Sequence, residues 1–410
     1  MLAAGLMALA VGATVAVGGT CDCPGDCDAD CTISASDFSR VVSAVFAPVA
    51  AAQCPVSDAN GDGRVSAADI TVVHLARARP PIGCAAEPTA TATELPTVTR
   101  TPTTPLPPTA TPSPTVAATP VSRWIPLPPL PLGGRQEVGV AHLDGRVYVI
   151  GGFAPMPSAR VEAYDIAAGE WVEIAPLPVA GHHIGAAAAG GHVYAVGGLR
   201  ALTFTPTSDV FRYDADRDVW EPVASLPSAR GALAVAEVDG RIHAVGGIGA
   251  GGGAVADHAA YLPDEDRWVD LAPYPIAREH IAGAAVDGVL FVVGGRSPLT
   301  TAAHRWDHES GNWHELPPMP TRRAGHAAAA LDGRLVTFGG EGNNQNSRGI
   351  FPEVEVYDPA TDRWTRLANM RAPRHGIGAA TVGDRIYVPG GADVQAFGAV
   401  ATHDALEIDF

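Results

Sequence analysis

The sequence predicts an all-β fold built as a radial array of six small antiparallel sheets. Three observations support it. A glycine pair recurs six times in 410 residues, at spacings of 45 to 51 residues, and each pair ends a short β-branched run. Five pairs are followed by an aromatic residue, and a tryptophan comes seven residues after each of these aromatics. Regular internal periods of this length indicate repeat architectures with one small sheet per repeat. The pairs are Gly151-Gly152, Gly197-Gly198, Gly246-Gly247, Gly294-Gly295, Gly339-Gly340 and Gly390-Gly391.

Each repeat reads as four strands. In the first, the apolar residues 138–141 are followed by Asp144-Gly145, a dipeptide typical of two-residue hairpin turns. The β-rich run 146–150 ends at the glycine pair, and residues 161–165 alternate as a third strand. A fourth strand begins at Trp171 and ends before Pro176, since proline cannot donate in a ladder.

The sixth repeat ends after its third strand, residues 405–410. Trp124-Ile125-Pro126 stands before the first repeat and resembles the other fourth strands. We therefore expect this upstream segment to pair with the C-terminal strand, which closes the ring and removes an exposed sheet edge.

The register of Gly-Gly, aromatic-Asp and Trp markers resembles the kelch repeat, with about 50 residues per unit. The resemblance covers residues 122–410. It implies a six-bladed β-propeller closed by an N-terminal strand.

Residues 1–20 are apolar and uncharged, as in the core of a secretion signal, so we expect a secreted or cell-surface protein. A retained membrane anchor is the alternative, because about 20 apolar residues can span a bilayer. All six cysteines lie within residues 21–84, which favours disulfides in an oxidising compartment. Zinc ligation by Cys21, Cys23, Cys27 and Cys31 is the other reading of this cluster.

Two twelve-residue acidic loops in the same region have the oxygen-ligand spacing that Ca²⁺ prefers, and each runs into an apolar helical pattern. The first loop offers Asp26, Asp28, Asp30, Thr32 and Asp37. The second offers Asp58, Asn60, Asp62, Arg64 through its carbonyl, Ser66 and Asp69.

The paired loops resemble a dockerin module, which implies a small α-helical calcium-binding domain over residues 21–84 and a cohesin-like or cell-surface partner. The second loop matches closely, whereas Cys31 replaces the usual turn glycine of the first. Loop positions 10 and 11 hold Ala35-Ser36 and Ala67-Ala68, which departs from the polar residues that carry cohesin recognition in the best-known type. A calcium-stabilised cap is the alternative role.

Residues 85–121 are rich in Thr, Pro and Ala and are predicted to be an extended linker. The net charge of −17 and the lack of basic stripes argue against nucleic-acid binding. The chain has no lysine, which excludes Schiff-base and P-loop chemistry.

An arginine stands 16 residues before the glycine pair in five repeats, where the chain enters a new unit, and histidines lie nearby. Such a ring at one mouth of the channel would favour a carboxylate, a sulfate or an acidic glycan. The other reading is structural, with each arginine bound to backbone or to an acid between blades. The candidate ligand-binding residues are Arg135, His182, His183, Arg230, Arg278, Arg323, His326, Arg374 and His375.

These patterns favour a monomeric extracytoplasmic binding protein whose propeller recognises a glycan or protein. The alternative is a sugar epimerase or mutarotase of the sialic-acid type, an activity found among six-bladed kelch proteins. Its candidate catalytic residues would be Glu137, Glu279 and His280. A third reading is a purely structural surface component.

Overall fold

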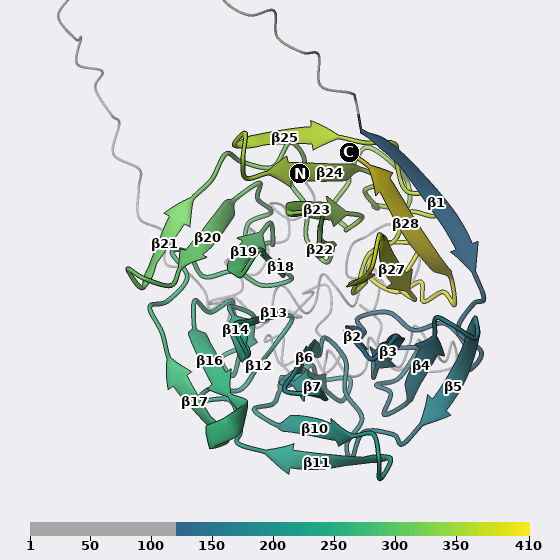
Figure 1. Cartoon of the computed structure of the whole chain (residues 1–410), viewed down its shortest axis with the longest axis vertical. Helices are drawn as coiled ribbons and strands as arrows, with labels where there is room; N and C mark the ends of the chain where they lie inside the picture. Colours follow the sequence, from purple (N-terminus) through teal and green to yellow (C-terminus); the bar gives the residue numbers. More distant parts are fainter. Residues whose placement is uncertain (1–119) are drawn as a thin grey trace, which may run out of the picture.

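The computed structural model describes residues 120–410. Six four-stranded antiparallel sheets surround a central axis, as Figure 1 shows, and this confirms the predicted all-β propeller. The helical element within the described residues is a single 3₁₀ turn, η2 (Pro263–Glu265), and no helix in this part of the chain is long and apolar enough to cross a bilayer. The predicted leader, cysteine cluster, calcium loops and most of the linker lie outside the described residues.

The first three blades each run from an inner strand at the axis to an outer strand at the rim. Blade 1 contains β2 (Gly139–Leu143), β3 (Arg146–Ile150), β4 (Val161–Asp165) and β5 (Glu170–Ile174). Blade 2 contains β6 (Gly185–Ala189), β7 (His192–Val196), β10 (Val210–Asp214) and β11 (Val219–Val223). Blade 3 contains β13 (Ala234–Val238), β14 (Arg241–Val245), β16 (His258–Leu262) and β17 (Arg267–Asp270).

Blades 4 and 5 follow the same order, whereas blade 6 combines the two ends of the described chain. Blade 4 contains β18 (Ala282–Val286), β19 (Val289–Val293), β20 (Ala303–Asp307) and β21 (Asn312–Glu315). Blade 5 contains β22 (Ala327–Leu331), β23 (Arg334–Phe338), β24 (Val354–Asp358) and β25 (Arg363–Arg366). Blade 6 contains β26 (Ala380–Val382), β27 (Arg385–Pro389), β28 (His403–Asp409) and β1 (Val121–Leu127).

Four short strands form two small ladders in the loops near the axis. These ladders pair β8 (Leu199–Arg200) with β9 (Thr205–Pro206) and β12 (Arg230–Gly231) with β15 (Ile248–Gly249).

The closing strand pairs as the sequence predicts. β1 runs antiparallel to β28 in seven residue pairs, from Val121 opposite Asp409 to Leu127 opposite His403. The Trp124 ring packs edge-on against Phe338 of blade 5, with 5.8 Å between centroids. The N-terminal strand therefore supplies the outer edge of the last blade and also contacts the blade before it (Figure 1).

The glycine pairs join neighbouring blades. Gly246 and Gly247 have φ angles of 61° and 109°, and a Cβ on Gly247 would lie 2.6 Å from the carbonyl oxygen of Gly231. The Gly247 amide donates to the carbonyl of Arg278, at the entry to the next blade, over 2.8 Å. Only glycine combines this backbone conformation with this close approach.

The fourth-strand tryptophans hold the rim together. The Trp220 indole Nε1 donates a 2.9 Å hydrogen bond to the Ala175 carbonyl of the preceding blade. Four other tryptophans repeat this bond to the corresponding carbonyl of the preceding blade. These pairs are Trp171 with Pro128, Trp268 with Ala224, Trp313 with Ala272 and Trp364 with Pro317.

Candidate functional site at one mouth of the channel

Six equivalent residues, one from each blade entry, form a ring at one end of the channel. Each has a left-handed backbone, with φ between 51° and 59°. Each amide donates to the carbonyl of its counterpart in the preceding blade over 2.7–3.0 Å, and the Glu137 amide closes the circle by donating to Gly376. We call these residues the mouth ring. They are Glu137, His183, Ala232, His280, Gly325 and Gly376.

The mouth ring is chemically asymmetric. Blades 1, 2 and 4 contribute ionisable side chains, whereas the other three positions hold alanine or glycine. The ring and the residues that follow it line a central cavity of about 130 Å³. A left-handed backbone is uncommon at glutamate and histidine, and strain of this kind clusters at functional sites. The ring therefore points to the cavity mouth as the site.

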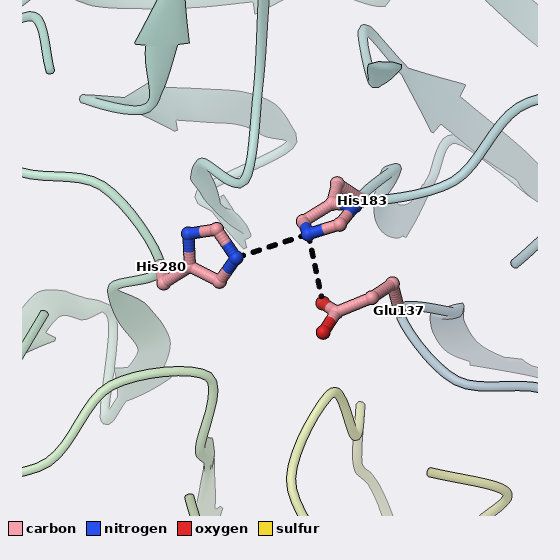
Figure 2. A group of neighbouring side chains, drawn as sticks. All are labelled: Glu137, His183 and His280. Atoms are coloured by element: carbon pink, nitrogen blue, oxygen red, sulfur yellow. Dashed lines mark hydrogen bonds and ion pairs between the residues drawn. The ribbon is translucent and has the colours of Figure 1, made fainter. Parts of the chain in front are cut away.

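Glu137, His183 and His280 converge at this mouth, as Figure 2 shows. The His183 Nε2 atom lies 2.9 Å from His280 Nε2 and 3.4 Å from the Glu137 Oε2 atom. One ligand atom from each residue lies within 4.8 Å of the other two. Their side chains are at most 11% exposed.

A network of buried charges surrounds this group. The Arg296 Nε atom donates to Glu279 over 3.0 Å, its Nη1 atom donates to Glu341, and its Nη2 atom lies 3.2 Å from His280 Nε2. Burial alone would raise the pKa of Glu279, but the charges of Arg296 and His280 outweigh burial and hold that pKa well below its usual range. Glu279 is therefore ionised at neutral pH.

His375 connects two carboxyl groups. Its Nδ1 atom lies 3.6 Å from Glu137 Oε1 and 3.6 Å from Glu341 Oε2, while its Nε2 atom donates to the Val394 carbonyl over 3.0 Å. Burial raises the pKa of Glu137. Burial acts in the same direction on Glu341, but His375 and Arg296 outweigh it and lower its pKa to about 2. The two carboxyl groups thus have pKa values shifted in opposite directions.

The structure brings together six of the sequence-predicted residues. His182 joins the five named above through its Nδ1 atom, which lies 2.5 Å from His183 Nδ1. The assembled set is Glu137, His182, His183, Glu279, His280 and His375.

The five predicted arginines are buried and are not among the residues that line the cavity. Three are paired with an acid on the third strand of their own blade: Arg135 with Glu162 at 2.5 Å, Arg323 with Glu355 at 2.7 Å, and Arg374 with Asp404 at 2.8 Å. Arg230 donates to the Ala244 carbonyl and Arg278 to the Pro298 carbonyl. These contacts match the structural reading, and ligand contact by the arginines stays an untested prediction.

His326 follows the ring residue Gly325 and occupies the place that Ile184, Ile281 and Ile377 take in other blades. It packs on Gly294 of the preceding blade, and burial lowers its pKa well below 6.5. It is therefore a neutral imidazole in an aliphatic slot, and its predicted ligand-binding role is also untested.

Arg296 and Glu341 were missed by the sequence reasoning. Both directly follow a glycine pair, a position at which the other four blades carry apolar residues. Each forms a β-bridge with the residue that directly precedes a mouth-ring residue. Arg296 pairs with Glu279, and Glu341 pairs with Ala324. An alignment of the six units on their glycine pairs would have shown two opposite charges at one otherwise apolar position.

An aromatic group borders the mouth. The Phe153 ring lies 5.1 Å from Phe397 and 6.2 Å from Phe204, measured between centroids, and also contacts His182. Gln136 holds the loop that carries Phe397, because its side chain donates to the Ala396 carbonyl and accepts from the Gly398 amide. A cluster of aromatic rings therefore lies beside the charged residues.

The Kelch motif family matches residues 134–178, 180–227, 277–320 and 322–371, which cover blades 1, 2, 4 and 5 together with the entry that precedes each of them. Four kelch motifs therefore lie in the propeller of this chain. Curated relatives match this chain over short stretches. "Kelch-like protein terF" of Aspergillus terreus is 33% identical over 94 residues, 20% of each chain. "Kelch-like protein 1" of Mus musculus is 44% identical over 55 residues, 13% of this chain and 7% of the relative.

"Kelch-like protein 5" of Homo sapiens is 48% identical over 44 residues, 11% of this chain and 6% of the relative. The matched stretches thus span a fifth or less of these relatives. A solved structure described as "Structure of YjhT" superposes on 69% of this chain and 99% of its own with a TM-score of 0.60 and 16% identity, which supports the fold alone.

The Dockerin type I domain family matches residues 24–75. This match confirms the predicted dockerin-like module and indicates an extracellular or cell-surface setting, since dockerins bind cohesins and typically bind calcium. The kelch propeller indicates a role in protein binding or ligand recognition.

Proposed function

We propose that this protein is a surface-attached glycan-binding protein, in which the mouth ring and its charged neighbours hold a terminal sugar. One observation carries the proposal: Glu137, His183 and His280 line the cavity of about 130 Å³ at the mouth, and Glu279, Arg296, Glu341 and His375 adjoin them in one network of charges from five blades. A small site with several hydrogen-bonding groups suits a sugar unit better than a broad protein surface.

The neighbouring aromatic group supports a sugar ligand. The rings of Phe153, Phe204 and Phe397 form a cluster that contacts His182 and His183. Sugars combine hydroxyl groups with apolar C–H faces, so a polar pocket beside aromatic rings complements both. Loops that carry such groups on a rigid scaffold are the usual place for binding sites.

A glycan array probed with the full chain tests the proposal. We expect a restricted set of bound glycans, with binding lost in Glu137→Gln and His375→Gln. Glu173→Gln is the matched control, because Glu173 lies exposed on the outer strand of the same blade as Glu137. Binding that survives both mouth variants, or a partner that proves to be a protein, would overturn the proposal.

We propose further that the dockerin-like module binds Ca²⁺ and attaches the protein to a cohesin-like or surface partner. The sequence match to dockerin type I domains supports this. Calorimetric titration of the full chain with Ca²⁺ should show heat from at least one site, and Asp58→Ala with Asp62→Ala should remove it. No heat at millimolar Ca²⁺ would contradict this assignment.

A second candidate is acid–base isomerisation of a sugar, such as exchange of sialic-acid anomers. The His375 imidazole between two buried carboxyl groups, at 3.6 Å from each, favours it. Carboxyl and imidazole groups within reach of one another can exchange protons with a bound sugar. Anomer exchange followed by NMR should then be faster than the uncatalysed rate and lost in Glu341→Gln, with Glu173→Gln unaffected; exchange at the uncatalysed rate excludes this candidate.

A further inference from the structure

The entry arginine of blade 4 lacks the acid that its counterparts have. In blades 1, 5 and 6 that acid is the second residue of the third strand, and it lies opposite the residue two positions before the glycine pair. In blade 4 the ladder places His304 at this position, opposite Val292. The described residues bring no carboxylate oxygen within 4.0 Å of the Arg278 guanidinium.

His304 is bonded to a tyrosine instead. Its Nδ1 atom lies 2.9 Å from the Tyr274 hydroxyl oxygen, and the two ring centroids are 5.0 Å apart. Tyr274 stands four residues before the entry arginine, where the connections into blades 3, 5 and 6 carry Leu226, Met319 and Met370. An imidazole cannot neutralise a guanidinium, so the change of residue leaves the charge of the arginine uncompensated.

Arg278 is nevertheless buried, with 7% of the residue exposed, and a guanidinium keeps its charge in proteins. Its Nη1 atom donates to the Pro298 carbonyl over 3.0 Å. The entry arginines of blades 1, 3 and 6 instead bond a carbonyl of the second strand. A buried charge is costly unless it is paired. An anion from solvent would therefore stabilise this arginine.

One edge of the Arg278 guanidinium is unused. The Nε–H and one Nη2–H of an arginine point the same way and together bind a carboxylate. Neither atom of Arg278 has a hydrogen-bond partner among the described residues, and Nη2 retains contact with solvent. The same edge of Arg371 binds the Asp404 Oδ1 atom, at 3.0 Å from Nε and 2.6 Å from Nη2. An anion that reaches Nη2 of Arg278 from solvent therefore lies beside Nε as well.

We propose that the Nε–Nη2 edge of Arg278 binds the carboxylate of a small ligand at the entry to blade 4. The ligand supplies the negative charge that blades 1, 5 and 6 carry on their own third strands. Arg278, Tyr274 and His304 are not among the residues that line the cavity at the mouth. The site is therefore separate from the proposed glycan site, and its test does not depend on glycan binding.

Saturation-transfer NMR with acetate as the probe tests the site in the full chain, at constant Ca²⁺ concentration and ionic strength. The wild type should transfer saturation to acetate, and Arg278→Met should lose this signal. Arg241→Met, at the exposed first position of β14, is the matched control and should keep it. His304→Glu should also lose the signal, because it restores the acid of the other blades. Blade 1 already places Glu162 opposite Glu173, so an acid fits this ladder position.

Thermal unfolding gives a second readout. At an acetate concentration about ten times its dissociation constant, the melting temperature of the wild type should rise by about 2–4 °C. His304→Glu should melt above the wild type in the absence of acetate and should show no such rise. An equal rise in the two proteins, no saturation transfer from the wild type, or a transfer that Arg278→Met leaves unchanged would each overturn the proposal.

Discussion

The repeats carry the same side chain at the rim of this propeller but different side chains at its mouth. At the rim, five blades carry the same tryptophan with the same hydrogen bond to the preceding blade. At the mouth, six residues share one backbone conformation but carry four different residue types. Repeated side chains therefore hold the ring together, whereas the repeated backbone at the mouth presents side chains that differ. Chemistry is to be sought where the side chains diverge and the backbone does not.

Removal of the closing strand should have the largest effect on the rim. Deletion of residues 121–127 exposes the β28 edge and removes Trp124 from its packing against Phe338. Loss of one such aromatic costs about 3–5 kcal/mol, and each kcal/mol lowers the melting temperature by about 2–4 °C. We expect a fall of more than about 10 °C by circular dichroism. Deletion of residues 100–106 from the linker is the control, and an unchanged melting temperature for the first deletion would refute the structural role of β1.

Acid should destabilise the propeller at the blades whose third strand starts with a buried histidine. The third strand starts with valine in blades 1, 2 and 5 but with His258 and His403 in blades 3 and 6. Burial lowers the pKa of His258 to about 3 and that of His403 to about 4. In the unfolded chain the histidine pKa is about 6.5, so between this pH and the lower pKa values of the folded protein the unfolded chain binds more protons. Stability is therefore complete above about pH 6.5 and decreases as the pH falls toward about 4.

The measurement is the melting temperature of the full chain at pH 7.5 and at pH 5. A double variant, His258→Val with His403→Val, copies the residue of the other blades and should lose much of the wild-type difference between the two pH values. If the double variant and the wild type show the same difference, these histidines do not carry the acid sensitivity.

A smaller effect distinguishes the tryptophans of the rim from one another. Trp220→Phe removes the hydrogen bond to the Ala175 carbonyl and should cost about 1 kcal/mol, or about 2–4 °C. The Trp124 indole nitrogen has no hydrogen-bond partner among the described residues, so Trp124→Phe should cost less. A larger loss in Trp124→Phe would show that packing, not the hydrogen bond, dominates at the rim.

The smallest effect is expected inside the mouth ring. Alanine in the left-handed conformation of Ala232 is strained by about 1–2 kcal/mol, and Ala232→Gly removes this strain. Glycine also raises the entropy of the unfolded chain, which costs about 0.5–1 kcal/mol. The free energy of unfolding should therefore rise by about 0.5 kcal/mol. Gly376→Ala should be destabilising, because its Cβ would lie 2.6 Å from the Glu137 carboxylate oxygen. Chemical denaturation of both variants measures the difference, and a reversed order would contradict the proposed strain.

The blades were predictable because their signals are local. A turn dipeptide, a glycine pair and a tryptophan each act within a few residues, and Trp124 was recognisable as a missing fourth strand. The surroundings of the arginines were not fixed by such signals. The acids that hold Arg135, Arg323 and Arg374 come 27, 32 and 30 residues later, because the intervening loops differ in length.

The site was predictable only in part for the same reason. Glu137, Glu279 and His280 lie next to the blade entry and were visible from sequence register. Arg296 and Glu341 enter the mouth from the other side of the glycine pair, through β-bridges that bring residues about 17 positions apart together. The calcium ligands proposed for residues 26–69 remain predictions, since they lie outside the described residues.

The circle of six amide–carbonyl bonds at the mouth has a consequence for redesign. All six backbone donors and acceptors are engaged with one another, so a ligand at this end of the axis must be recognised by side chains. A Cβ added to Gly325 would have its nearest neighbour at 3.6 Å, an ordinary van der Waals contact. That position can therefore accept an asparagine, a residue that tolerates this backbone, and a new specificity could be installed in one blade while the other five keep theirs.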